Sequence, residues 1–384
     1  MPAPVTATRN PAIDTLRGIA ISLVMLLHFH LSYSLVDSPL ALLLPEDAIQ
    51  AVARNGNYGV TMFFVISGYL ITGTTMRRHG EPGKVDLRSF YAFRFARIMP
   101  GLVLALLIIL GLGLAGQPAF MNIAKPGWPE VGFPLALLSV LTFWHNVLMQ
   151  HAWYFNYAMN IYWSLSVEEM FYLLFPVLCV ALRRAWALAA ICLVAIVIGP
   201  LYRSHHAEDE IRFLYAYPAC FDAIAFGCCA ALLAERWRVG GKPALLLRLL
   251  AALLVTVTYL RGIRGNETFG FTLIAFGTAA LLVVIHGEAP RRPAHRNPFL
   301  AAIRWMGRHS YELYLFHIIV LGLMRGAWPR GTLAYGDKGM AMAAFVGLSA
   351  LAAWTVARFY TEPLNARLRQ AFRRPEKSPL RSEA

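Results

Sequence analysis

IDTLRGIAISLVMLLHFHLSYS, residues 13–34, is the first of many apolar segments in this chain. It is long enough to cross a bilayer as one helix, for which about 20 apolar residues suffice. It also carries Asp14, Arg17 and His28. At about 100° per residue, Asp14 lies roughly 40° to one side of His28 and Arg17 roughly 20° to the other, so all three share one helical face. Because ionisable groups are costly inside a bilayer, this face is predicted to be functional.

The composition is that of an integral membrane protein. Of the 384 residues, 58% are hydrophobic and 15% are charged. Apolar runs recur along nearly the whole length, which predicts one polytopic all-α domain. Residues 13–34 are expected to be a retained helix and no secretory signal, because the run is long, carries charges and lacks a small-residue cleavage site.

Cysteine usage and net charge exclude other classes of protein. The five cysteines lie in apolar segments without metal-ligand spacing to histidines, so we expect no disulfide framework, no zinc site and no other metal. The net charge is +14, but the basic residues lie between apolar segments. Membrane topology therefore explains the charge, and no nucleic-acid partner is expected.

Charge also predicts which apolar segments cross the membrane. If all of them crossed, the basic clusters at 77–88 and 183–184 would lie on opposite sides, against the positive-inside rule. Residues 131–150 are the weakest candidate, since they contain Pro134 and end in a polar stretch. The apolar segments are 13–34, 58–77, 91–115, 131–150, 161–182, 186–202, 214–234, 244–260, 268–286, 309–324 and 340–360.

With 131–150 as a re-entrant or interfacial helix, about ten transmembrane helices remain and both termini are cytoplasmic. Most of the 35 Lys and Arg residues then lie on the cytoplasmic side. Partly inserted backbone is tolerated only where it lines a protein cavity, so the segment also predicts an outward-facing cleft.

Two ionisable residues are predicted at one depth near the outer face. By helical rise, His28 lies roughly 9 Å and Glu168 roughly 10 Å from the outer ends of their segments. A carboxylate beside an imidazole can fix its tautomer and raise its basicity, as a general base requires. A structural pair is the alternative. Of the adjacent acids Glu168 and Glu169, one is expected to face a different helix or the interface.

Arg94 and Arg97 lie one turn apart at the cytoplasmic start of the third apolar segment. Guanidinium groups bind phosphate bidentately, so this pair suits a nucleotide-bearing donor. Anchoring at the membrane surface is the alternative. Asp222 and His317 fall near mid-membrane, where either could join a relay or satisfy a neighbouring helix.

Five segments of the chain, in order, resemble the bacterial acyltransferase-3 family. The resemblance covers residues 10–365 and implies a transmembrane acyltransferase domain at 1–365, followed by a basic cytoplasmic tail at 366–384. It also implies catalytic roles for Arg17 and His28, a donor-side role for Arg94 and Arg97, and importance for Glu168. The five segments are 13–28, 59–72, 94–100, 163–172 and 307–317.

Such enzymes are multi-pass proteins of the bacterial inner membrane. The resemblance implies transfer of an acyl group, commonly acetyl, from cytoplasmic acyl-CoA to a hydroxyl of an envelope or exported carbohydrate or glycolipid. In our hypothesis His28 is the general base, tuned by Glu168 or Asp14. Arg17, about 16 Å from His28 along the helix, holds the donor or bridges to Asp14. The acceptor, the acyl chain length, a possible acyl-enzyme and the oligomeric state stay open.

A transporter or flippase for a glycan or organic acid is the alternative from another class. The buried polar residues would then form a substrate or proton pathway. The absence of an evident inverted repeat in the sequence weighs against it. A scaffold that binds membrane lipids would explain the basic loops but leaves the buried polar face unexplained.

Overall fold

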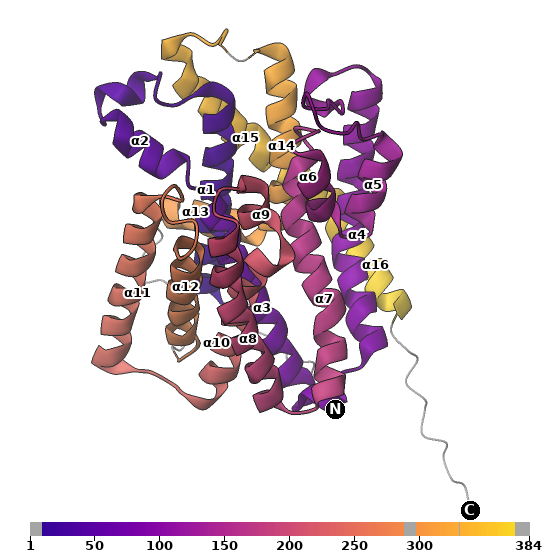
Figure 1. Cartoon of the computed structure of the whole chain (residues 1–384), viewed down its shortest axis with the longest axis vertical. Coiled ribbons are helices and arrows are strands. Elements are labelled where there is room, and N and C mark those ends of the chain that lie inside the picture. The colour runs from indigo at the N-terminus through magenta and orange to yellow at the C-terminus, as the bar shows by residue number, and fades with distance from the viewer. Residues whose placement is uncertain (1–9, 288–296, 330, 373–384) are drawn as a thin grey trace, which may run out of the picture.

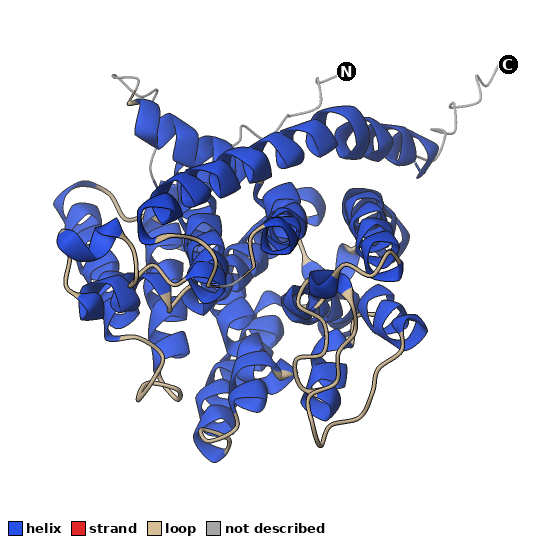
Figure 2. Cartoon of the chain, turned by 90° about the horizontal axis from the view of Figure 1, so that it is seen from above, coloured by secondary structure: helices blue, strands red, loops and turns tan. Residues whose placement is uncertain are grey.

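The computed structural model describes residues 10–287, 297–329 and 331–372. The described residues form helices and loops without a strand (Figure 2). The longer helices, with one 3₁₀ turn (η4) and one π turn (η6), are α1 (Pro11–Tyr33), α2 (Glu46–Ala53), α3 (Asn57–His79), α4 (Leu87–Leu114), α5 (Phe133–Leu141), α6 (His145–Ala152), η4 (Asn160–Tyr162), α7 (Trp163–Leu182), α8 (Ala185–His205), α9 (Glu210–Tyr215), α10 (Tyr217–Arg236), α11 (Gly241–Arg261), α12 (Gly270–Gly287), α13 (Pro298–Arg308), α14 (Ser310–Ala327), α15 (Lys338–Val356), η6 (Ala357–Thr361) and α16 (Glu362–Phe372).

Within the described chain, nine helical segments are long and apolar enough to cross a membrane. They overlap nine of the ten predicted crossing segments to within two residues. The tenth, 309–324, is the 18-residue helix α14, whose apolar sequence is interrupted by Glu312, His317 and Arg325. It packs in the bundle against α1, α4 and α15. The prediction of an all-α polytopic membrane protein is confirmed.

Residues 131–150 form no continuous span. They give two short helices, α5 with nine residues and α6 with eight, far below the roughly 20 residues that a crossing needs. The break between them includes Phe143, whose φ of 64° is unusual for a residue with a side chain. Figure 1 shows α6 above the start of α7, towards the end of the bundle that also holds α2.

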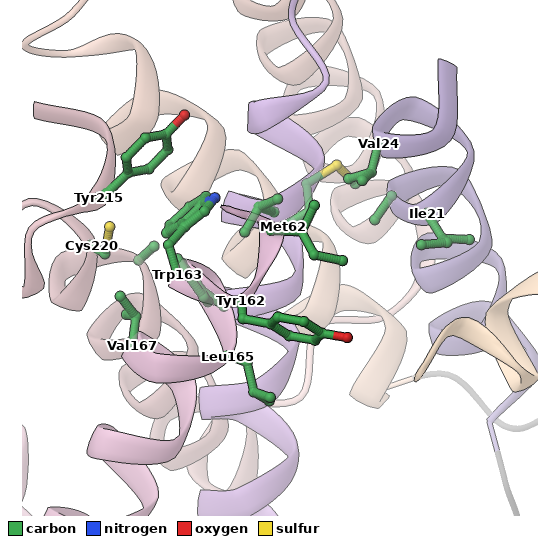
Figure 3. Close-up of a cluster of buried hydrophobic side chains, with 14 of the residues drawn as sticks. Ile21, Val24, Met62, Tyr162, Trp163, Leu165, Val167, Tyr215 and Cys220 are labelled. Carbon is green, nitrogen blue, oxygen red and sulfur yellow. The ribbon is translucent and has the colours of Figure 1, made fainter. Parts of the chain in front are cut away.

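Helix α7 therefore begins inside the protein. Tyr162 is fully buried and Trp163 is 8% exposed. The Trp163 ring lies 4.5 Å from that of Tyr215, measured between centroids, and Ser166 Oγ accepts the backbone N–H of His145 at 3.1 Å. In Figure 3, Tyr162 points towards the side of Ile21, and Trp163 lies between α7 and Tyr215.

Glycines allow the central helices to approach closely. A Cβ atom on Gly227 of α10 would lie 2.0 Å from the Val65 carbonyl oxygen of α3. One on Gly307 of α13 would lie 1.8 Å from the Asp14 carbonyl oxygen of α1. Small residues have this role in many membrane bundles, because helix association there depends on close backbone packing.

The C-terminal helices lie along one edge of the bundle. Helices α15 and α16, joined by η6, form one long bent helix that ends at the C-terminal trace (Figure 2). Helix α16 packs against α4, and Thr361 Oγ1 donates to Glu312 Oε1 of α14 at 2.9 Å. The predicted tail at 366–384 thus begins within a packed helix; its residues after 372 lie outside the described residues.

Replacing Gly227 by alanine tests this packing. The new Cβ has to displace the backbone of α3, so we expect a loss of about 1–3 kcal/mol, as for other overpacked sites. A thermal unfolding curve in detergent should show a lower midpoint. Gly347→Ala in α15 is the matched control, because its Cβ would meet nothing within 4 Å and alanine is the better helix former. Equal midpoints for both variants would contradict the assigned α3–α10 contact.

Candidate active site

A cavity of about 860 Å³ lies between α1, α3, α4, α7, α14 and α16. Its lining follows α3 from Val60 to His79, a helical rise of about 28 Å. One end reaches the loop between α3 and α4, where Arg78 and Asp86 are exposed; we call this end the mouth. The other, inner end lies at Val60 and Ser164. A cavity of this volume can bury most of the surface of a small-molecule ligand.

The charge of the lining favours an anionic ligand. Five arginines line the cavity, whereas Asp86 and Glu168 are its two acidic residues. An excess of one sign of charge, focused between low-dielectric walls, attracts ligands of the opposite sign. The five arginines are Arg17, Arg78, Arg94, Arg97 and Arg369.

The predicted phosphate-binding pair has two different environments. Arg94 Nη2 and Nε lie 2.7 and 3.1 Å from Glu169 Oε1, and the guanidinium lies 3.4 Å from the centroid of the Tyr172 ring. Its donors thus point largely at a neighbouring helix. Arg97, one turn later, is exposed and lines the cavity. Of the two arginines, only Arg97 has the environment expected of a phosphate ligand.

The predicted pairing of Glu168 with His28 is not found. Glu168 Oε1 accepts the Tyr172 hydroxyl at 2.8 Å and also the hydroxyl of Ser67, and the carboxylate faces the cavity. The sequence-based depth was wrong because it assumed that α7 starts at the outer surface. Since the start of α7 is buried beneath α6, Glu168 lies further along the bundle, beside Arg94 at 3.4 Å.

The predicted polar face of α1 is divided among three environments. Arg17 lines the cavity, and its Nη2 and Nε donate to Ser310 Oγ at 2.8 and 3.1 Å. Asp14 is 6% exposed and lies where α1 meets α13 at Gly307. Among the described residues that line the cavity, Asp14 and His28 are missing.

His28 pairs with a second histidine. His317 Nε2 lies 3.0 Å from His28 Nδ1, and His317 Nδ1 lies 2.8 Å from the Leu313 carbonyl oxygen. A carbonyl can only accept, so neutral His317 carries its proton on Nδ1 and accepts at Nε2. His28 then donates from Nδ1, which leaves its Nε2 as an unprotonated base.

The histidine pair lies directly behind the cavity wall. Tyr314 lines the cavity, and its ring centroid is 6.0 Å from that of His317. His317 is fully buried, whereas His28 is partly exposed. Ser310, Tyr314 and His317 recur at spacings of four and three residues, which place them on one face of α14. This spacing could have linked His317 to the site from the sequence alone.

Other polar residues take structural positions. Asp222 Oδ2 pairs with Arg203 Nη2 at 2.6 Å, and both side chains are buried. Arg203 also donates to Thr272 of α12 at 2.6 Å, so this cluster joins α8, α10 and α12, apart from the cavity lining. Within the described ranges, no group of three or more His, Cys, Asp and Glu side chains is placed to hold a metal ion.

Comparisons with known proteins identify the family of the chain. A family model described as an acyltransferase domain matches residues 10–358. O-acetyltransferase OatA of Staphylococcus aureus (strain NCTC 8325 / PS 47) is 23% identical over 343 residues, covering 84% of this chain and 52% of the relative. A putative O-acetyltransferase of S. aureus (strain COL) is 23% identical over 349 residues, with the same coverage.

The chain thus spans about half the length of these relatives. No solved structure matches the chain. The family match extends over nearly the whole helical bundle, including every helix that lines the cavity except α16. This protein therefore belongs to the acyltransferase-3 family, whose model describes an acyltransferase domain, and it is a multi-pass membrane protein.

Proposed function

We propose that the protein is an O-acyltransferase that uses acyl-CoA, acetyl-CoA in the simplest case, and acylates a carbohydrate or glycolipid at the outer face of the bacterial inner membrane. One observation carries the proposal: an arginine-rich cavity ends at Tyr314, behind which lies the His28–His317 pair. The names of the two relatives support acetyl as the acyl group.

The donor enters from the cytoplasm. The loop between α3 and α4 and the helix ends beside it are rich in arginine and lysine, which favours a cytoplasmic mouth and, with it, cytoplasmic termini. Arg97 and Arg17 face the cavity and bind donor phosphate or carbonyl oxygen. Glu168 keeps the hydroxyls of Ser67 and Tyr172 oriented at the cavity wall.

His28 is the general base. Its Nε2 takes the proton of the acceptor hydroxyl while the hydroxyl oxygen attacks the thioester carbonyl carbon. The carbon–sulfur bond breaks, the ester forms and the CoA thiolate leaves; the proton on His28 then passes to the thiolate or to water. His317 is a positioning residue, because it acts through the hydrogen bond that fixes the His28 tautomer.

A transfer assay tests the proposal. Purified protein is incubated with acetyl-labelled acetyl-CoA and an envelope glycan extract, and both glycan label and free CoA are measured. We expect the two products in equal amounts. A transporter or flippase would move its substrate without releasing CoA, and that result would overturn the proposal.

Replacing the two histidines separates chemistry from positioning. His28→Ala should lower kcat by about 10²- to 10⁴-fold, the usual contribution of a general base. His317→Leu should lower kcat roughly tenfold, the equivalent of one hydrogen bond. His317→Gln should restore much of the loss, because its amide oxygen can accept from His28 Nδ1.

His30→Ala is the matched control at equal protein level, since His30 faces away from His28 and its Nδ1 accepts the backbone N–H of Leu35. We expect its kcat to stay within about twofold of the unaltered protein, as a group outside the reaction should. Equal activity of His317→Leu and His317→Gln would argue against the hydrogen-bonded relay.

The two arginines of α4 should differ when replaced. Arg94→Gln leaves Glu169, which is 4% exposed, without its cation, and breaking such a pair costs about 3–5 kcal/mol when fully buried. Arg97→Gln should leave the unfolding midpoint nearly unchanged but raise KM for acetyl-CoA. A further Glu169→Gln substitution should recover part of the stability of Arg94→Gln. Additive losses in this double-mutant cycle would exclude the pair as a stabilising contact.

A further inference from the structure

We propose that the mouth of the cavity is a subsite for the nucleotide end of the donor, in which Arg78 and Arg369 bind the 3′-phosphate and Phe93 packs against the adenine base. This inference rests on the proposed use of acyl-CoA. It concerns residues outside the motifs that predicted a donor site, since none of the three belongs to those motifs.

Three helices meet at Phe93. The Arg78 guanidinium of α3 lies 5.9 Å from the centroid of the Phe93 ring of α4, and the Arg369 guanidinium of α16 lies 5.6 Å from it. All three side chains line the cavity. Both groups are cations near the same ring, so a phosphate bound beside that ring would be attracted by both. Arginine suits this role because its planar fork binds phosphate oxygens bidentately.

The aromatic surface favours a nucleotide over a simple phosphate. Phe90 and Phe93 lie one turn apart on α4, and both line the mouth region. Aromatic rings stack on the faces of nucleobases, whereas inorganic phosphate or a lipid headgroup presents no such face. A phosphate beside a purine therefore uses both features of the mouth.

The subsite also lies at the opposite end of the cavity from the proposed reaction site. Arg78 and Val60 are at opposite ends of the α3 lining, about 27 Å apart by helical rise. A nucleotide held at Arg78 leaves the extended pantetheine arm to follow the cavity to Ser164 and Tyr314. The thioester then lies at the wall next to the histidine pair.

Paired donors test the subsite. KM is measured for acetyl-CoA and for acetyl-3′-dephospho-CoA in the unaltered protein and in Arg78→Gln and Arg369→Gln. We expect each substitution to raise KM for acetyl-CoA about tenfold, as the loss of one charge-assisted hydrogen bond would. KM for the dephospho donor should stay the same, and kcat should stay the same for both donors.

Neighbouring arginines give matched controls. Arg77→Gln and Arg367→Gln remove equal charge from α3 and α16 at exposed positions that are not in the cavity lining. Neither should change KM. An equal rise in KM for both donors would overturn the assignment to the 3′-phosphate. A rise in KM in the two control variants as well would also overturn it.

Two further measurements separate the remaining explanations. The first is KM in nanodiscs with and without phosphatidylglycerol. If the mouth bound an anionic lipid headgroup, the effect of the substitutions on KM would depend on the lipid and not on the donor. That result would overturn the subsite. Equilibrium binding of CoA against 3′-dephospho-CoA needs no turnover. If acetyl transfer fails with both donors but Arg369→Gln weakens binding of CoA alone, the subsite stands and the proposed function falls. Equal binding of both ligands removes the subsite.

Discussion

The ion pair between Arg94 and Glu169 fixes the wall on which the cavity depends. Helices α4 and α7 make few direct contacts with each other, and the cavity opens beside them. In an apolar interior an unpaired carboxylate would be costly, so Glu169 holds Arg94 at 2.7 Å. The ring of Tyr172, which lies on α7 as Glu169 does, covers the Arg94 guanidinium. This contact sets the place of Glu168, whose carboxylate is left to face the cavity.

A second constraint acts along α1 and α14. Two side-chain links join these helices, Arg17 to Ser310 and His28 to His317. Both residue numbers increase from the first link to the second, so the helices run in the same direction. The first link lies on the cavity and the second beyond its wall. The carbonyl of Leu313 fixes the proton on His317, and the backbone of α14 thereby sets the tautomer of a side chain on α1.

Much of the fold could be predicted because the length of an apolar segment and the basic residues of a loop are local features of the sequence. That 131–150 forms no continuous crossing helix was predictable from its proline and polar end. The depth of Glu168 was not, since it depends on how α5 and α6 pack over the start of α7. The sequence does not show which helix Glu168 and Glu169 each face, so their roles could not be told apart. The partner of Arg94 could therefore not be predicted either. Arg369 was missed because its place depends on the return of the C-terminal helix to α4.

The wall at Tyr314 bears on how the thioester of the proposed donor is protected from hydrolysis. Tyr314 contacts Ser164 Oγ at 2.6 Å and also donates to the Ile161 carbonyl, so its ring is tied to the buried start of α7. On the proposed mechanism, this ring separates the donor from the side on which His28 is partly exposed. Water is a competing acceptor wherever a base meets an activated acyl group. The proposed mechanism therefore needs this wall to keep water away from the thioester, and α5 and α6, which pack against α7, support the wall.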